Sequence, residues 1–514
     1  MKSVAPSHHS LIEAKNLYLE HLDRRNLFSF DLRNLDRTGF SIKVASLRDD
    51  KGFVNDGFGY GTSELESEVG ALGEISETFH LHYALRNTPS CIGLSYEEMV
   101  TQFGTDTVIN PKKLCLPAGT SYTGWIPLKW VEVRSFPSQN PSWIPKEFIA
   151  ASLADYNSPS LNKIKDSGNS PARLINPITC GLGAGTTLEQ ALSHAIYELL
   201  QRDGNCTSFR ALDQGIDIEM DEVTDSDILS IFHNLARIGI NLRPKLASTE
   251  FDLCNLYVVA EDNFAKEKQN YFPLLISSCG EAVDANREKA LRKASTEYLA
   301  SRCRKTFMHG PLEEIRKITP QKYFDHVVHQ QNPSMEEERS LKAMIDWLGK
   351  TPTQLFDLLK DSVFSSKSKV KFSSLPHDAR SHNHTHKDRL DSLLRKLNGE
   401  NLSIFYFDAS PHENAGPRAV KAAVTKLEGE TMSYYRIGER GYKRLEKLDL
   451  GIVGKGKKPH SRCLSIVLDE EAMDRVGSNL WVDANRIDST ISDLYALYRE
   501  PSSHTAQLSL EGVP

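Results

Sequence analysis

The chain has 514 residues, of which 39% are hydrophobic and 25% charged, and its net charge is -6. This composition is typical of a globular protein with a large core, and it provides no sequence-wide basic surface, which argues against a reader of the nucleic-acid backbone unless a local basic patch exists. No apolar run reaches the roughly 20 residues that span a bilayer, and the N-terminus lacks a signal-peptide core. We therefore expect a cytoplasmic protein that engages neither membranes nor nucleic acid.

The cysteines are scattered along the chain without a CxxC pair. This pattern favours unpaired thiols in a reducing compartment and gives no indication of a zinc site. A helical leader comes first, and residues 40–47 then alternate apolar and polar side chains as a strand does. A helix follows from about Ser63 to Ala84, with Thr62 or Ser63 as its N-cap. The segments CIGLSYEEMV, TGWIPLKWVEVRSF and SWIPKEFIAASL are rich in predicted strands.

A glycine-rich turn, GLGAGTT at residues 181–187, opens the next helix. Thr187 and Gln190 fit the capping-box pattern at its start. Free backbone amides and the helix dipole favour an anion at such a position. A tight turn without a ligand explains the same residues, because the turn matches neither GxGxxG nor GxxxxGK[ST]. The absence of GxGxxG also argues against a Rossmann-type oxidoreductase.

Strands and helices alternate beyond this helix, as in a mixed α/β domain. DSDILSIFHNLARIGI is amphipathic, LYVVA and YFPLLISS are predicted strands, and residues 286–304 form a helix. Residues 310–400 are interpreted as an insertion that contains two helices and a mobile polar loop at 364–388. Strands return at 402–410 and 419–427.

Three of the predicted helices carry acidic side chains among apolar ones. Residues three apart share a helix face, so Glu74 projects with Glu77, and Glu198 with Gln201. Such pairs are often solvated surface, but the apolar neighbours here favour partial burial, where a carboxylate needs a partner or a metal. Mg²⁺ is commonly held by a few carboxylates and substrate phosphates. Glu297 lies on the third helix.

Other polar residues allow more than one interpretation. His382, His384 and His386 are typical metal ligands, but no acid or cysteine framework accompanies them. His194 either orients Glu198 or packs in the core, and the second is favoured. The run from Glu428 to Arg444 includes Arg436 and Arg440 and either closes over a site or forms an interface.

The order of these motifs resembles the YcaO family of ATP-using proteins, whose members activate a backbone amide. The resemblance runs from about Leu27 to Arg440 and includes NLDRTGFSIKVASLR, GYGTSELESEVGALGEISE, GLGAGTTLEQALSHAIYELLQRD and EKALRKASTEYLASR. It implies a YcaO-type α/β fold with mixed sheets and acid-bearing helices around a central nucleotide site. Residues 1–26 would be a helical extension, 27–445 the YcaO-like domain and 446–514 a C-terminal extension.

The resemblance implies ATP and Mg²⁺ as cofactors. The implied metal ligands are Glu74, Glu77, Glu198 and Glu297. The implied ATP contacts are Glu77, Gly183, Thr186, Gln190, Gln201, Arg202 and Lys293. Glu74, Glu198 and Arg202 would be the catalytic residues.

The chain departs from the family pattern at several of its motif positions. Tyr60 replaces a lysine, Thr78 and Lys293 replace arginines, Gln190 and Gln201 replace acids, and Thr186 replaces an asparagine. Glutamine keeps an oxygen ligand but removes a charge, and lysine meets phosphate without the bidentate fork of arginine.

The resemblance implies ATP-dependent O-phosphorylation of a backbone amide in a peptide or protein, leading to an azoline, a thioamide or a related group. The alternative is a nucleotide-binding scaffold or regulator without turnover. The chain ends in SLEGVP rather than the PxPxP tail of azoline-forming members, so a standalone protein is expected. A separate partner protein and a homodimer are both compatible with this expectation.

Overall fold

The computed structural model describes residues 8–49, 53–160, 162–268, 271–380, 384–412 and 416–512. The chain divides into two compact units that interleave along the sequence. The first unit comprises Met1–Ile75, Ser208–Asn383 and Ile491–Pro514, and the second comprises Ser76–Thr207 and His384–Thr490. Helices α2 (Glu64–Asn87) and α5 (Leu188–Ser208) each begin in one unit and end in the other.

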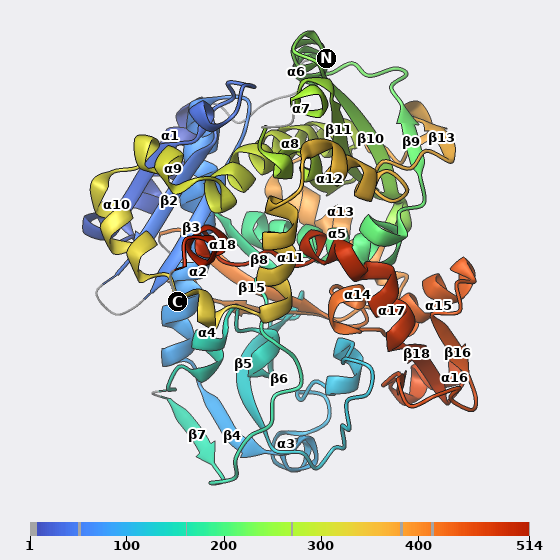
Figure 1. The fold of residues 1–514 in the computed structure, drawn as a ribbon. Coiled ribbons are helices and arrows are strands. Elements are labelled where there is room, and N and C mark those ends of the chain that lie inside the picture. Colours follow the sequence, from blue (N-terminus) through green and yellow to red (C-terminus); the bar gives the residue numbers. More distant parts are fainter. Residues whose placement is uncertain are drawn as a thin grey trace. The chain divides into compact units, whose positions relative to one another are not determined.

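The first unit contains two sheets. One is antiparallel, in the order β1 (Leu27–Asp31), β2 (Lys43–Arg48) and β3 (Val54–Gly59). The other has the order β12-β11-β10-β9-β13, formed by Gly280–Asp284, Cys254–Asp262, Ile240–Ser248, Ile216–Glu219 and Ser368–Lys371. Helix α8 (Arg287–His309) packs against β11 and β12 (Figure 1), which gives the mixed α/β arrangement that the sequence predicts.

Amphipathic helices cover the strands of this unit. In α6 (Ser226–Arg237) the side chains of Ile228, Ile231 and Leu235 are buried against the five-stranded sheet, and Asp225 caps the first turn. The remaining helices of the unit are α1 His8–Glu20, α7 Asn263–Glu267, α9 Leu312–Ile318, α10 Gln321–His326, α11 Glu338–Leu348, α12 Pro352–Leu359 and α18 Thr505–Leu510.

The second unit is built on a seven-stranded sheet. Its order is β7-β4-β5-β14-β15-β8, with β6 paired to β5. The strands are β4 Ser90–Leu94, β5 Leu128–Phe136, β6 Pro141–Pro145, β7 Lys163–Asp166, β8 Leu182–Gly185, β14 Ile404–Asp408 and β15 Arg418–Val424. A separate small sheet has the order β16 (Val453–Lys455), β18 (Leu480–Asp483) and β17 (Cys463–Ser465).

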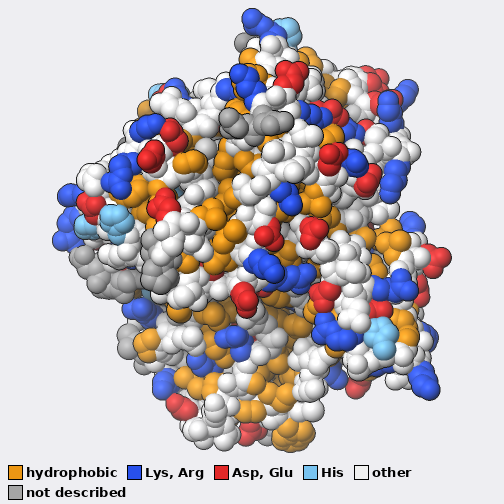
Figure 2. Space-filling view, viewed as in Figure 1, with side chains coloured by type: hydrophobic (Ala, Val, Ile, Leu, Met, Phe, Trp, Pro, Cys, Tyr) orange, Lys and Arg blue, Asp and Glu red, His pale blue; other side chains and the backbone are white. Residues whose placement is uncertain are grey.

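The helices of the second unit are mostly short. They are α3 Tyr96–Phe103, α4 Leu153–Asn157, α13 His386–Asn398, α14 Thr431–Tyr434, α15 Glu439–Leu448, α16 Glu470–Val476 and α17 Ala484–Ile491. Across the described ranges, not one helix has the length and apolar character that crossing a bilayer requires. Basic and acidic side chains are interspersed on the face shown in Figure 2.

Three local predictions are wrong. The segment SYEEMV forms helix α3 rather than a strand, because Ser95 and Glu98 make a reciprocal capping box. The predicted strand YFPLLISS contains a 3₁₀-helix, Pro273–Ser277, since Pro273 has no N–H to donate to a sheet. The loop expected at 364–388 contains strand β13, which pairs in parallel with β9.

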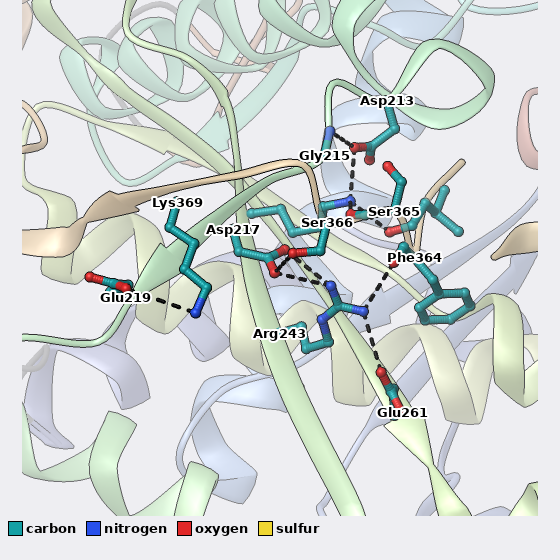
Figure 3. Close-up of polar contacts among 12 residues, drawn as sticks. Asp213, Gly215, Asp217, Glu219, Arg243, Glu261, Phe364, Ser365, Ser366 and Lys369 are labelled. Carbon is teal, nitrogen blue, oxygen red and sulfur yellow. Dashed lines mark hydrogen bonds and ion pairs between the residues drawn. The ribbon is translucent and has the colours of Figure 1, made fainter. Parts of the chain in front are cut away.

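A buried polar network explains why β13 joins the sheet, and Figure 3 shows Asp213 and Ser365 of this network. Lys245, a fully buried residue of β10, donates from Nζ to the carboxylate of Asp213 at 2.8 Å. The same ammonium donates to the carbonyl oxygens of Val363 at 2.9 Å and Ser365 at 2.8 Å. A buried ammonium must be paired and fully hydrogen-bonded, so it fixes the segment that precedes β13.

Replacing Lys245 with methionine should lower the free energy of unfolding by about 3–5 kcal/mol, because it leaves the Asp213 carboxylate buried without its counter-charge. Lys369→Ala is the matched control on β13. It removes an exposed ion pair of 3.9 Å to Glu219, which should cost about 0–1 kcal/mol. Chemical denaturation of the full chain measures both, and equal losses would contradict the assigned role of Lys245.

Candidate functional site

The first acidic helix, α2, is held against β3 by a close approach of backbone to backbone. A Cβ atom at Gly59 would lie 1.7 Å from the carbonyl oxygen of Ser67, so only glycine lets the strand cross the helix there. Two turns beyond Ser67, the side chain of Glu74 extends to the strand, and the backbone N–H of Phe58 donates to its Oε2 at 2.7 Å. The partly buried carboxylate is therefore oriented by the strand.

The second acidic helix, α5, repeats this arrangement after β8. A Cβ atom at Gly183 would lie 2.2 Å from the carbonyl oxygen of Ala191. The backbone N–H of Gly181 donates to Oε2 of Glu198 at 2.8 Å. Arg202 lies one turn further, 3.9 Å from the other carboxylate oxygen, and its side chain is 39% exposed. The turn thus presents an oriented carboxylate beside an accessible guanidinium.

The third acidic helix, α8, follows β12 in the same way. A Cβ atom at Gly280 would lie 2.0 Å from the carbonyl oxygen of Ala294. The hydroxyl of Tyr60, just beyond β3, donates to Oε2 of Glu297 at 3.2 Å. The first and third motifs therefore meet within the first unit.

The three motifs share one spacing. Each of the three glutamates follows a glycine at the strand by 17 residues. The pairs are Gly57 and Glu74, Gly181 and Glu198, and Gly280 and Glu297. The same strand-to-helix unit is thus used three times, although the copies are unequally spaced along the chain and do not form a repeat of fixed period.

Lys421, on β15, supports the second motif and was missed by the sequence analysis. Its buried ammonium donates to the carbonyl oxygens of Ile178 at 2.6 Å and Cys180 at 2.5 Å, which fixes the glycine turn. Burial lowers its pKa to about 8, against the opposing charges of Glu198 and Glu77. The available signal was a single lysine inside the apolar strand AVKAAV, because a charge in a buried strand needs partners.

The arginine-rich run after β15 is anchored inside the second unit. Asp203, fully buried on α5, pairs with Arg440 at 3.1 Å and Arg444 at 2.5 Å. Although burial opposes them, these two arginines hold the pKa of Asp203 below its ordinary value. Arg436 donates to the carbonyl oxygens of residues 114 and 115. These contacts attach α15 to α5 and account for the three arginines.

A cavity of about 60 Å³ lies beside Arg202 in the second unit. Its wall is mostly apolar, but two buried glutamates, Glu147 and Glu428, are among the residues that line it. Each has one oxygen without a hydrogen-bond partner among the described residues. Burial raises the pKa of both groups to about 7. Near neutral pH these carboxyl groups can therefore serve as hydrogen-bond donors as well as acceptors.

The predicted site residues are divided between the two units. Glu74, Glu297 and Lys293 belong to the first, and Lys293 is exposed. The second unit holds Glu77, Gly183, Thr186, Gln190, Glu198, Gln201 and Arg202. Gln201 is only 6% exposed. His194 is exposed, so its expected place in the core is wrong.

The capping prediction for α5 is half right. Thr187 accepts a hydrogen bond from the backbone N–H of Gln190 at 3.2 Å, as expected. The Gln190 carbonyl oxygen, however, accepts from the backbone N–H and the hydroxyl of Thr186, at 2.9 and 3.1 Å. In the histidine cluster, His382 lies outside the described residues and His386 begins α13.

Comparison with known proteins identifies the class. Residues 58–428 match the model of a family described as a YcaO cyclodehydratase that binds ATP and Mg²⁺. The match covers more than half of the chain and includes all three acidic helices. The chain belongs to the YcaO family, which confirms the expected fold.

One similar protein is an uncharacterized protein of Methanothermobacter thermautotrophicus. It is 23% identical over 289 residues, which are 55% of this chain and 66% of that protein. The chain therefore spans slightly less than two thirds of this relative. Among solved structures, YcaO from Methanopyrus kandleri bound with AMPPCP and Mg²⁺ has a TM-score of 0.52 and 16% identity, covering 84% of this chain and 93% of that one.

A heterocyclase in complex with substrate and cofactor is also similar, with a TM-score of 0.54 and 13% identity over 82% of this chain and 54% of that one. Family membership assigns ATP and Mg²⁺ to the chain as cofactors. The residues present fit these ligands. Glu74 and Glu198 are oxygen donors already oriented by backbone amides, as Mg²⁺ prefers. Arg202 offers a guanidinium for phosphate.

Glu428→Gln should stabilise the protein at pH 8 but not at pH 4. The folded-state pKa of about 7 exceeds the ordinary 4.5, so the free energy of unfolding is highest below pH 4.5 and falls as the pH rises to 7. The decrease reaches about 3 kcal/mol. Glutamine does not ionise, and the variant therefore lacks this decrease. Denaturant titrations between pH 4 and 8 measure the difference, and the exposed Glu470→Gln serves as the control. A difference that does not grow with pH would contradict the raised pKa.

Proposed function

We propose that the chain uses ATP and Mg²⁺ to activate a backbone amide of a peptide or protein by O-phosphorylation. The observation that carries the proposal is the repeated strand-to-helix unit, in which a glycine precedes each of three glutamates by 17 residues and a strand glycine lies against the backbone of the helix. Two of these carboxylates accept a hydrogen bond from a backbone amide. Orientation by the backbone lowers the cost of assembling oxygen ligands around a cation.

In this proposal the residues have distinct roles. Glu74, Glu77, Glu198 and Glu297 hold Mg²⁺, while Arg202 and Lys293 contact the phosphates. The nucleotide contacts on α5 and the turn before it are Gly183, Thr186, Gln190 and Gln201. Lys421 keeps the turn in place through its two carbonyl contacts.

The chemistry that ATP supplies is a γ-phosphoryl group, and Mg²⁺ neutralises charge on the phosphates. A thiol, a hydroxyl or sulfide adds to the amide carbon, and the resulting oxyanion takes the phosphoryl group, which releases ADP. Loss of phosphate and of one proton then leaves an azoline or a thioamide. The nucleophile belongs to the substrate or is added to it, so the reaction requires no cysteine of this chain. A separate partner protein would present the substrate.

A second candidate is a nucleotide-binding scaffold without turnover. It is favoured by Tyr60, whose neutral hydroxyl is bound to Glu297 where the family pattern has a lysine. Gln201 also favours the scaffold, because this buried amide occupies a position where the family pattern has an acid. Both candidates bind nucleotide, and they differ in whether phosphate is released.

Isothermal titration calorimetry of the full chain tests the nucleotide site. ATP should bind only with Mg²⁺, and Glu74→Gln or Glu198→Gln should weaken binding at least tenfold, because each keeps its backbone hydrogen bond but loses the negative charge. Glu64→Gln is the matched control, since Glu64 lies at the exposed start of the same helix, α2. Wild-type protein that takes up no Mg²⁺-ATP would refute both candidates.

Phosphate release separates the enzyme from the scaffold. Wild-type protein incubated with Mg²⁺-ATP and peptide libraries should release phosphate, while Glu198→Gln should not. Release above background in the wild type alone supports amide activation. Tight Mg²⁺-ATP binding without release, with or without peptide, supports the scaffold instead.

A further inference from the structure

Three side chains of metal-ligating type converge in the C-terminal part of the second unit, outside the residues that match the family. They are His460, Cys463 and Asp483, and one ligand atom of each lies within 4.8 Å of the others. Cys463 and Asp483 are cross-strand partners in the pairing of β17 with β18. The backbone N–H of Cys463 donates to the carbonyl oxygen of His460 at 3.1 Å, so a tight turn brings the histidine to the same place.

The distances are those of a coordination sphere. Nε2 of His460 lies 3.1 Å from Oδ2 of Asp483 and 3.6 Å from Sγ of Cys463. Ligand bonds of about 2.3 Å to sulfur and 2.0–2.1 Å to nitrogen and oxygen, at tetrahedral angles, give ligand separations of about 3.6 Å for S···N and about 3.3 Å for N···O. The two separations measured from Nε2 of His460 thus match those of ligands on one zinc ion, and Sγ of Cys463 lies within 4.8 Å of the Asp483 carboxylate.

A catalytic triad does not explain the cluster. In a triad the imidazole uses one nitrogen toward the carboxylate and the other toward the nucleophile. Here Nε2 faces both Asp483 and Cys463. A single ring nitrogen carries one proton or one lone pair, and so it makes one good hydrogen bond. A cation between the three atoms satisfies all of them at once.

The surroundings of the cluster suit a metal site. The second carboxylate oxygen of Asp483, Oδ1, accepts from the backbone N–H groups of Asn485 at 3.0 Å and Arg486 at 3.2 Å. Oδ2 faces His460 and also lies 3.6 Å from Nε of the largely exposed Arg486 side chain, which a bound cation would displace. Such outer contacts fix the orientation of a ligand. Cys463 is 1% exposed and Asp483 6%, whereas the His460 side chain is 40% exposed and leaves a path for the ion.

We propose that His460, Cys463 and Asp483 bind Zn²⁺ with three protein ligands and one open position. A thiolate, an imidazole and a carboxylate together favour zinc over Mg²⁺ or Ca²⁺, which take oxygen ligands. The ion ties the turn that contains His460 to the small sheet β16-β18-β17. This site is independent of the nucleotide site and of the function proposed for it.

Cobalt substitution tests the site in the full chain, reduced with a phosphine and freed of metal by chelation. One equivalent of Co²⁺ should produce a thiolate-to-cobalt charge-transfer band, and one equivalent of Zn²⁺ should abolish it. Cys463→Ser should lose the band, and His460→Gln should weaken Co²⁺ binding at least tenfold. Ser461→Ala, an exposed position in the same turn, should behave as the wild type.

Zn²⁺ should also raise the melting temperature of the wild type and of Ser461→Ala but not of Cys463→Ser, because a ligand that binds only the folded state stabilises it. Far-UV circular dichroism identifies variants that fold without metal. A wild type without the charge-transfer band would overturn the proposal, and so would a folded Cys463→Ser that keeps the band. Neither result depends on ATP.

Discussion

The close crossing of a glycine-containing strand over a helix is the constraint on which the acidic motifs depend. Where Gly59, Gly183 and Gly280 meet their helices, an added Cβ would lie 1.7–2.2 Å from a backbone oxygen. No side chain fits at that distance, so the strand and the helix approach each other as bare backbones. At the first two motifs this closeness lets a strand amide reach a carboxylate on the helix, at 2.7 and 2.8 Å. The backbone therefore orients these two carboxylates, a task that would otherwise need several side chains.

The substitutions relative to the family pattern balance in charge. Tyr60 and Thr78 stand where the pattern has a lysine and an arginine, and Gln190 and Gln201 stand where it has two acids. Two cations and two anions are thus lost together, and Lys293 for arginine changes no charge. The hydroxyl of Tyr60 still donates to Glu297. The net charge contributed by these positions is therefore the same as in the family pattern.

Long periodic helices and local caps could be predicted from the sequence, whereas contacts between distant segments could not. Helices α2 and α8 begin within one residue of their predicted starts and end three and five residues beyond their predicted ends, and α5 begins directly after the glycine turn, as predicted. Apolar periodicity and capping are local signals. Strand β13 was missed because it depends on the buried ammonium of Lys245, over 100 residues away. Lys421 and the Asp203 network were missed for the same reason. The roles of the predicted nucleotide ligands remain a prediction.

Near neutral pH the second unit contains buried groups whose ionisation is unfavourable, and these groups lie around the second motif. Ionised Glu147 and Glu428 are costly above their pKa of about 7, while protonated Lys421 is costly below its pKa of about 8. Between these values, three groups beside the glycine turn and its cavity are largely in the charge states that burial disfavours. Their pKa values converge on neutrality because one apolar environment penalises both signs of charge. Such groups change protonation in response to changes in nearby charge. Perturbed acids and bases of this kind concentrate at functional sites, and their presence here supports the proposal that the second motif has a functional role.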